Sequence, residues 1–244
     1  MREQLKIIIF ATVVCLICSV LLAFVSTALK PRQERNKAND IKTKVLMVFG
    51  EKVTNKKGKV CISQNEIDSI FTNRISGIVL DAEGNLVKDK NVGDLTPQEI
   101  SDRNKETGLK AYYPVYIYKN KETGKKLYAI HVSGKGLWST IKGYMALEED
   151  LSTIAGMVFY EHQETPGLGG DVEKPYFQDR FKGKQWLDKG VVQEFEITKP
   201  GGAANNHSID GITAATMTCN GVEAFLNDDF KIYNKYFEKL RKNN

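Results

Sequence analysis

The apolar run at residues 7–29 constrains this chain more than any other feature of its sequence. It contains no charged residue and is rich in Ile, Val, Leu and Phe. At about 1.5 Å of helical rise per residue, it reaches across a hydrocarbon core of about 30 Å. It therefore predicts a transmembrane helix. A cleaved signal peptide is the alternative, since residues 26–28 are small, but the run exceeds the roughly 7–15 apolar residues usual there.

The basic residues that flank this run give a first indication of orientation. Two of them, Arg2 and Lys6, precede it, whereas six follow it: Lys30, Arg32, Arg35, Lys37, Lys42 and Lys44. A plain positive-inside count places the large domain in the cytoplasm. That rule applies to short loops, and long domains translocate largely regardless of charge. Orientation therefore stays open on charge alone.

The remaining chain is long enough for one domain. Of 244 residues, roughly 200 follow the apolar run, and these can bury a single substantial core. The net charge of +5 is mild, and the Lys and Arg residues are interleaved with Asp and Glu. A nucleic-acid partner is therefore not expected.

Four cysteines are too few for a disulfide framework in a chain this long. Cys15 and Cys18 share one helical face within the apolar run, where small residues usually serve helix packing. A redox or metal pair is the alternative for these two. Whether Cys61 and Cys219 meet cannot be deduced from the sequence.

Helix signals dominate the first half of the soluble region. Apolar residues recur at helical spacing over residues 35–49, which predicts an amphipathic stalk that continues the membrane helix. Ser63 and Glu66 form a capping box that opens a helix through residue 71, and residues 75–80 follow as a strand. Thr96 with Glu99 repeats the capping pattern, with Pro97 at the first helical position.

Strands dominate from residue 111 onward. Alternating or apolar runs predict strands at residues 113–118, 126–132, 141–147, 154–160 and 191–197. A final helix is indicated by the apolar face Val222, Phe225, Leu226, Phe230, Tyr233, Phe237 and Leu240. Asn220, with Glu223 three residues later, is the expected N-cap. The fold class is therefore α+β, with a mainly antiparallel sheet and peripheral helices. We expect three parts: residues 1–34, 35–110 and 111–244.

Three glycine-bearing loops are candidate sites for chemistry: residues 133–139, 161–170 and 210–221. Gly-Lys-Gly in the first loop lacks the spacing of a phosphate-binding P-loop. His131, His162 and His207 show no metal-ligand spacing, and no Gly-x-Ser-x-Gly nucleophile motif occurs. Each loop alone could be an ordinary turn.

Taken together, the loops fit a planar phosphorylated ligand. Trp138 and Leu168 supply an apolar wall, and the glycine-rich backbones supply donors at its polar edge. The third loop precedes the final helix, whose N-terminus favours an anion near Thr216. This combination indicates a mononucleotide cofactor.

The three loops also carry a family resemblance. The sequences Gly136-Leu137-Trp138-Ser139-Thr140, Glu164-Thr165-Pro166-Gly167-Leu168-Gly169-Gly170 and Asp210-Gly211-Ile212-Thr213-Ala214-Ala215-Thr216-Met217-Thr218 resemble the C subunit of the sodium-translocating NADH:quinone reductase. Gly143-Tyr144 and Phe159-Tyr160-Glu161-His162 extend the likeness. The resemblance covers the anchor and the whole soluble domain.

The resemblance implies a covalent flavin. FMN would be joined through its phosphate to the hydroxyl of Thr216, with Asp210 as the acid and Thr213 as the upstream hydroxyl of the motif. Ala214 stands where glycine is usual, and its methyl group disfavours a positive φ. The other expected FMN contacts are Trp138, Ser139, Glu164, Thr165, Gly167, Leu168, Ala215 and Thr218, together with Asp210 and Thr213. No catalytic residue is expected.

The resemblance also implies a function and a location. The protein would relay single electrons from an iron–sulfur centre to the flavin of another membrane subunit, within a sodium-pumping complex. A flavin transferase would attach the FMN, and the lipid bilayer and the other subunits would be its partners. The expected location is the bacterial inner membrane, single-pass, with the soluble domain in the periplasm, against the charge count.

Two alternatives remain at this point. The related ferredoxin-oxidising complex has a flavoprotein with the same covalent chemistry, although the loops at residues 136–140 and 164–170 favour the quinone reductase. A cofactor-free anchored binding module is the second alternative.

Overall fold

The fold was analysed in a computed structural model that describes residues 2–53, 55, 60–120, 124–202 and 205–243. The chain divides into two compact units, residues 1–42 and 43–244. The three-part division proposed above stays a prediction.

The first helix, α1 (Arg2–Val48), contains the whole apolar run and continues through the predicted stalk. Within the described residues it is the one helix long and apolar enough to span a membrane. The apolar side chains of residues 7–29 are exposed, as a lipid-facing surface requires, with Phe10, Leu22 and Phe24 each at 72%. All four cysteines are free thiols; only Cys219 is buried.

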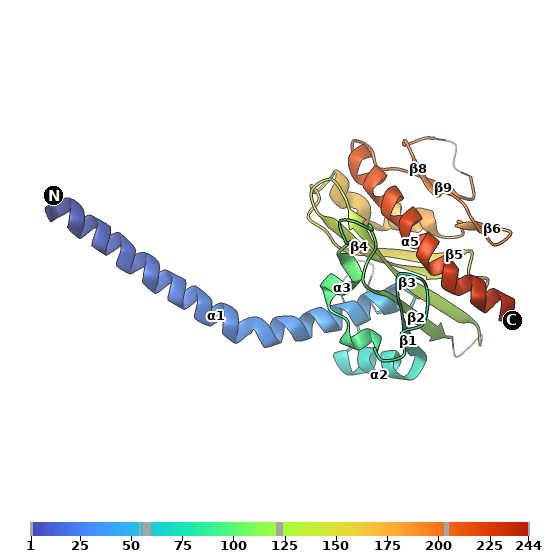
Figure 1. The fold of residues 1–244 in the computed structure, drawn as a ribbon, viewed down its shortest axis with the longest axis horizontal. Coiled ribbons are helices and arrows are strands. Elements are labelled where there is room, and N and C mark those ends of the chain that lie inside the picture. Colours follow the sequence, from blue (N-terminus) through green and yellow to red (C-terminus); the bar gives the residue numbers. More distant parts are fainter. Residues whose placement is uncertain (1, 54, 56–59, 121–123, 203–204, 244) are drawn as a thin grey trace. The chain divides into compact units, whose positions relative to one another are not determined.

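A five-stranded antiparallel sheet forms the centre of the second unit (Figure 1). Its strands follow chain order: β1 (Ile75–Leu80), β2 (Tyr113–Lys119), β3 (Lys126–Lys135), β4 (Thr140–Leu147) and β5 (Ile154–Glu161). All five were predicted to within a few residues at each end. Alternating or continuously apolar runs identify them, because β3, β4 and β5 are buried on both faces over most of their length. The predicted fold class is confirmed.

The last helix, α5 (Thr216–Asn243), packs along one face of this sheet against β3 (Figure 1). Its predicted apolar face is buried from Val222 to Phe237 and joins the main core with residues such as Val115, Ile130 and Trp186. Tyr233 places its hydroxyl 2.9 Å from the carbonyl oxygen of His131, which ties the helix to β3.

The remaining helical segments are short. The two predicted capping boxes are confirmed, Ser63 with Glu66 opening α2 (Gln64–Arg74) and Thr96 with Glu99 opening α3 (Pro97–Ser101). Ile67 of α2 packs with Leu46 and Val53 in a smaller cluster. The other helical segments are η1 (Val92–Asp94), η2 (Gly169–Glu173), α4 (Pro175–Gln178) and η3 (Asp179–Phe181).

The strand predicted at residues 191–197 is wrong in part. The segment forms two short strands in different ladders, β7 (Val191–Val192), paired with β6 (Leu187–Asp188), and β8 (Glu196–Thr198), paired with β9 (Ser208–Asp210). The break has a visible cause. The side chain of Asn227 accepts from the Phe195 amide at 2.8 Å and donates to its carbonyl at 2.9 Å, in place of a strand partner.

The predicted N-cap at Asn220 is also wrong. Helix α5 begins at Thr216, and the Cys219 amide already donates to the Ala215 carbonyl oxygen at 2.9 Å. Asn220 therefore lies inside the first turns, and its side chain is exposed. The sequence favoured Asn220 because asparagine is a common cap. The start lies earlier, among small residues and threonines.

Candidate functional site

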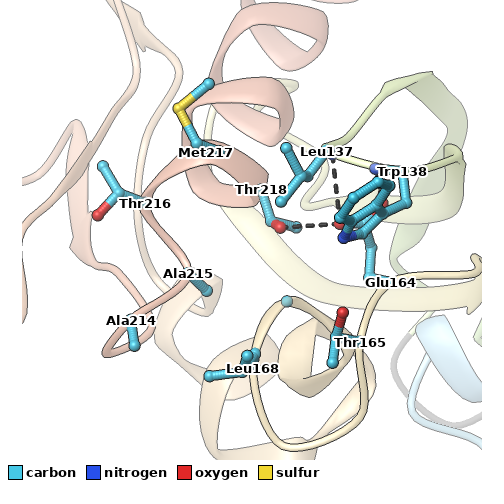
Figure 2. A pocket seen from close by; sticks show the side chains of 11 residues that line it. Leu137, Trp138, Glu164, Thr165, Leu168, Ala214, Ala215, Thr216, Met217 and Thr218 are labelled. Carbon is cyan, nitrogen blue, oxygen red and sulfur yellow. Dashed lines mark hydrogen bonds between the residues drawn. The ribbon is translucent and has the colours of Figure 1, made fainter.

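The three predicted loops meet at one cavity of about 390 Å³ (Figure 2). This volume lies within the roughly 300–1,000 Å³ range of small-molecule sites. Its lining residues come from the β3–β4 connection, the loop after β5 and the start of α5: Leu137, Trp138, Glu164, Thr165, Leu168, Gly169, Ala214, Ala215, Thr216, Met217 and Thr218. Segments far apart in the sequence therefore converge at the place where the sequence analysis predicted a ligand.

The walls of the cavity are largely apolar and open to solvent at its rim. Trp138 is 71% exposed and Met217 is 62% exposed, and Leu137 and Leu168 are exposed to a lesser degree. Exposed apolar side chains that gather around one cavity are typical of a ligand-binding site. These walls suit a planar apolar ligand.

The start of α5 has the properties of an anion seat. No residue of the described chain accepts a hydrogen bond from the amides of Thr216, Met217 and Thr218. Unpaired amides and the helix dipole, roughly +0.5 of an elementary charge, favour a phosphate at this end. The Thr216 hydroxyl stands on the first helical residue and is exposed. These residues fit a phosphorylated cofactor.

Thr216 and Thr218 point to different sides of the helix (Figure 2). Residues two apart in an α-helix do not share a face. Thr218 is buried and donates to Glu164 Oε2 at 2.8 Å. The two hydroxyls are therefore not interchangeable: one is engaged inside the protein, and the other is accessible.

Glu164 connects the three segments. Its Oε1 accepts from the amides of Trp138 at 2.9 Å and Ser139 at 3.1 Å. Its Oε2 accepts from the Leu137 amide at 3.2 Å and the Thr218 hydroxyl. Burial raises the pKa of Glu164, but the hydrogen bonds it receives outweigh this and lower the pKa below its ordinary value. The carboxylate is therefore ionised at neutral pH.

Several predicted site residues do not line the cavity. Asp210 ends β9, and its Oδ1 accepts from the Thr198 hydroxyl at 3.3 Å. Ser139 donates its amide to Glu164, and its hydroxyl accepts from the Gln163 amide at 2.7 Å. Thr213 and Gly167 are exposed turn residues outside the lining. Asp210 and Ser139 therefore stabilise the loops around the cavity through these hydrogen bonds.

Sequence reasoning missed other residues at the site. Leu137, Gly169, Ala214 and Met217 line the cavity but were not among the expected contacts. Arg180 was missed as well; its Nη1 donates to the carbonyls of Asp210 at 2.7 Å and Gly211 at 2.8 Å, holding the strand that leads to the α5 start. The apolar character of Leu137 and Met217 beside site residues was an available signal, but none identified Arg180.

Ala214 occupies the conformation that the sequence placed in doubt. Its φ is +59°, in the left-handed region, where a non-glycine residue costs roughly 1–2 kcal/mol. Replacing Ala214 by glycine removes this strain, but glycine also loses more conformational entropy on folding, which offsets roughly 0.5–1 kcal/mol of the stabilisation. We expect Ala214→Gly to raise the free energy of unfolding by about 0.5–1 kcal/mol in urea titrations. Ala215→Gly, at the buried neighbour without a positive φ, should lower it, and equal losses in both variants would contradict strain at Ala214.

The comparisons with known proteins agree with this site. The model of the FMN-binding domain family matches residues 136–230, which include residues 136–139 of the first loop and the whole of the other two. The chain is 32% identical to the C subunit of the Na(+)-translocating NADH-quinone reductase from Pseudomonas aeruginosa, covering 91% of this chain and 89% of that protein. The same subunit from Neisseria meningitidis is 31% identical, with 88% and 85% covered.

Two solved structures share the fold. The crystal structure of this subunit from Parabacteroides distasonis superposes with a TM-score of 0.69 at 27% identity, covering 85% of this chain and 96% of that one. The crystal structure of NqrC from Shewanella oneidensis gives a TM-score of 0.69 at 27% identity, with 84% and 99% covered. The relatives decide between the two complexes that the loops left open. The chain belongs to the family of C subunits of the Na(+)-translocating NADH-quinone reductase, an oxidoreductase complex, and carries the FMN-binding domain of that family.

Proposed function

We propose that this chain is a membrane-anchored electron-transfer subunit whose FMN is joined by a phosphoester to Thr216. The observation that carries the proposal is the start of α5. There an accessible threonine hydroxyl on the first helical residue adjoins three unpaired amides at the rim of an apolar cavity. A phosphodiester keeps a single negative charge, which suits a seat built from amides. Glu164 is the one ionisable residue among the described lining residues, so the seat contains no Lys or Arg.

Attachment requires help from another protein. A threonine hydroxyl is a weak nucleophile unless a base or a metal activates it. The one ionisable lining residue, Glu164, is already engaged by Thr218 and three loop amides. We therefore assign the reaction to a flavin transferase that uses an activated FMN donor, one whose FMN phosphate carries a phosphoanhydride leaving group. Thr216 Oγ forms the new bond to phosphorus as the phosphoanhydride P–O bond breaks. The leaving phosphate group takes that electron pair, and a base of the transferase takes the hydroxyl proton.

Each group of residues has a separate task in this account. Bound FMN supplies one-electron exchange, and the protein orients it. The tether prevents loss of the cofactor over repeated redox cycles, and Trp138, Leu168 and Met217 shield it from water at the rim. The exposed rim leaves room for partners, which we take to be an iron–sulfur subunit as donor and another membrane flavin subunit as acceptor.

The proposed location is the inner membrane, with the domain after α1 on the periplasmic side. The basic residues after the apolar run oppose this orientation on a plain count. The positive-inside rule weakens for long translocated domains, and the second unit, residues 43–244, is such a domain.

One experiment tests cofactor and location together. The full chain is expressed with a flavin transferase, and spheroplasts are treated with external protease before a denaturing gel is read by flavin fluorescence. We expect a fluorescent band that survives denaturation and disappears on proteolysis. A colourless band would refute the covalent flavin, and a fluorescent band that resists protease in intact spheroplasts but not after lysis would refute the periplasmic domain.

A further inference from the structure

The geometry around Glu164 points to a role that differs from direct contact with the cofactor. We propose that Glu164 is a positioning residue, which clamps residues 137–139 to the first turn of α5 through Thr218 and sets a fixed negative charge in the cavity wall.

The carboxylate has little capacity left for a ligand. An ionised carboxylate offers about four lone-pair sites. Three loop amides and the Thr218 hydroxyl donate to it at 2.8 to 3.2 Å, and the Ser139 hydroxyl donates to Oε1 at 3.4 Å. Glu164 is only 4% exposed and Thr218 only 2%. A flavin donor would have to displace one of these partners.

The surroundings of the carboxylate are shaped for it. A Cβ atom at Gly136 would lie 2.7 Å from Glu164 Oε1, and one at Gly169 would lie 3.1 Å from Oε2 and overlap the Thr218 hydroxyl. Only glycine at these two positions lets the loops approach so closely. The clamp therefore depends on the glycines at positions 136 and 169 as well as on the side chains that form its hydrogen bonds.

The clamp links the two functional walls of the cavity. Its loop carries Leu137 and Trp138, which form the apolar wall. Its helix carries Thr216 in the same first turn as the buried Thr218. The hydrogen bonds of Glu164 therefore fix how far the apolar wall stands from the attachment point, a distance that decides how the ring is held.

The negative charge is not neutralised by a cation. Within the described residues, Glu164 makes no ion pair, and its partners are neutral amides and hydroxyls. A fixed negative charge beside a redox group opposes the addition of electrons, especially where burial weakens screening. Only this consequence rests on the proposed function; the clamp itself does not require a cofactor.

The clamp is tested on the full chain without flavin, expressed without the transferase and purified in detergent. Amide hydrogen exchange is measured for Leu137, Trp138 and Ser139. In Glu164→Gln we expect exchange at least about tenfold faster, since hydrogen bonds to a charged acceptor are lost. Thr218→Val should act in the same direction, and Thr218→Ser, which keeps the hydroxyl, should restore slow exchange. Glu161→Gln, which alters an exposed carboxylate at the end of β5, is the matched control.

The charge is tested on the flavin-loaded chain by redox titration. Glu164→Gln should shift the midpoint potential to more positive values, and Glu161→Gln should shift it less. Unchanged amide exchange in both Glu164→Gln and Thr218→Val would overturn the clamp, and an unchanged midpoint potential in Glu164→Gln would overturn the effect of the charge.

If the wild-type chain acquires no flavin, the proposed function fails, while amide exchange still decides the clamp. If Glu164→Gln does not fold, Thr218→Val and its serine counterpart decide instead.

Discussion

Replacing Thr216 by alanine is expected to abolish covalent flavin while leaving the domain folded. The exposed hydroxyl is the only atom through which the proposed phosphoester can form at this residue, so the loss should be complete. Stability should change by no more than about 0.5 kcal/mol, because the side chain is exposed. The measurement is flavin fluorescence on a denaturing gel, with thermal unfolding followed by circular dichroism.

Two matched variants locate the effect at this hydroxyl. Thr216→Ser keeps a hydroxyl on the first helical residue and should keep the flavin band. Thr213→Ala removes the exposed hydroxyl three residues upstream and should leave the band in place. An undiminished band in Thr216→Ala, or its loss in Thr213→Ala alone, would show that attachment occurs elsewhere.

Replacing Asp229 by asparagine is expected to cause the largest loss of stability. Its fully buried carboxylate lies 2.8 Å from Arg103 Nη2 and 2.8 Å from Lys110 Nζ, and Lys110 is itself fully buried. It also accepts from the Ser133 amide at 3.1 Å. Burial lowers the pKa of Lys110 to about 8, although Asp229 opposes that shift. Asp229 therefore joins α5 to β3 and to the segment before β2.

Asp229→Asn leaves two cations without a counter-charge inside the protein. Breaking a buried pair in this way costs about 3–5 kcal/mol. We expect a loss of that size in the free energy of unfolding, measured by urea titration of the domain. The adjacent Asp228 is the control, since among the described residues its one ion pair is the exposed contact with Lys231 at 3.6 Å. Asp228→Asn should change stability by no more than about 0.5 kcal/mol, and a similar small loss in both variants would contradict the buried network.

Much of the fold was predictable because it depends on local patterns. Strands β1 to β5 are runs of alternating or continuously apolar residues, and the face from Val222 to Phe237 repeats at helical spacing. Capping boxes at Ser63 and Thr96 need only residues three apart. These signals act within a few residues, so a single sequence contains them in full.

The errors arose where distant residues decide local structure. Asn227 of α5 takes both backbone groups of Phe195 and divides one predicted strand into two. At the start of the same helix, unpaired amides at Thr216 replace the expected cap at Asn220. A helix start without a side-chain cap contradicts the usual rule, and such exceptions are common at functional sites.

The site was predictable in outline but not in its internal connections. Trp138, Thr165 and Leu168 line the cavity as the loops suggested, and their contact with FMN stays a prediction. The link from Glu164 to Thr218 spans 54 positions in the chain, and no pattern in the sequence marks it. Arg180 donates to backbone carbonyl oxygens, and because every residue type has one, the sequence does not show which residues Arg180 contacts.

The covalent bond at Thr216 is the central claim, and the intact mass of the chain tests it most directly. The full chain is purified from membranes that also contain a flavin transferase and is analysed under denaturing conditions, beside Thr216→Ala. The account predicts that the wild-type mass exceeds that of the unmodified chain by one FMN minus one water, and that fragmentation places the addition on Thr216. An unmodified wild-type mass, or the same addition on Thr216→Ala, would contradict it.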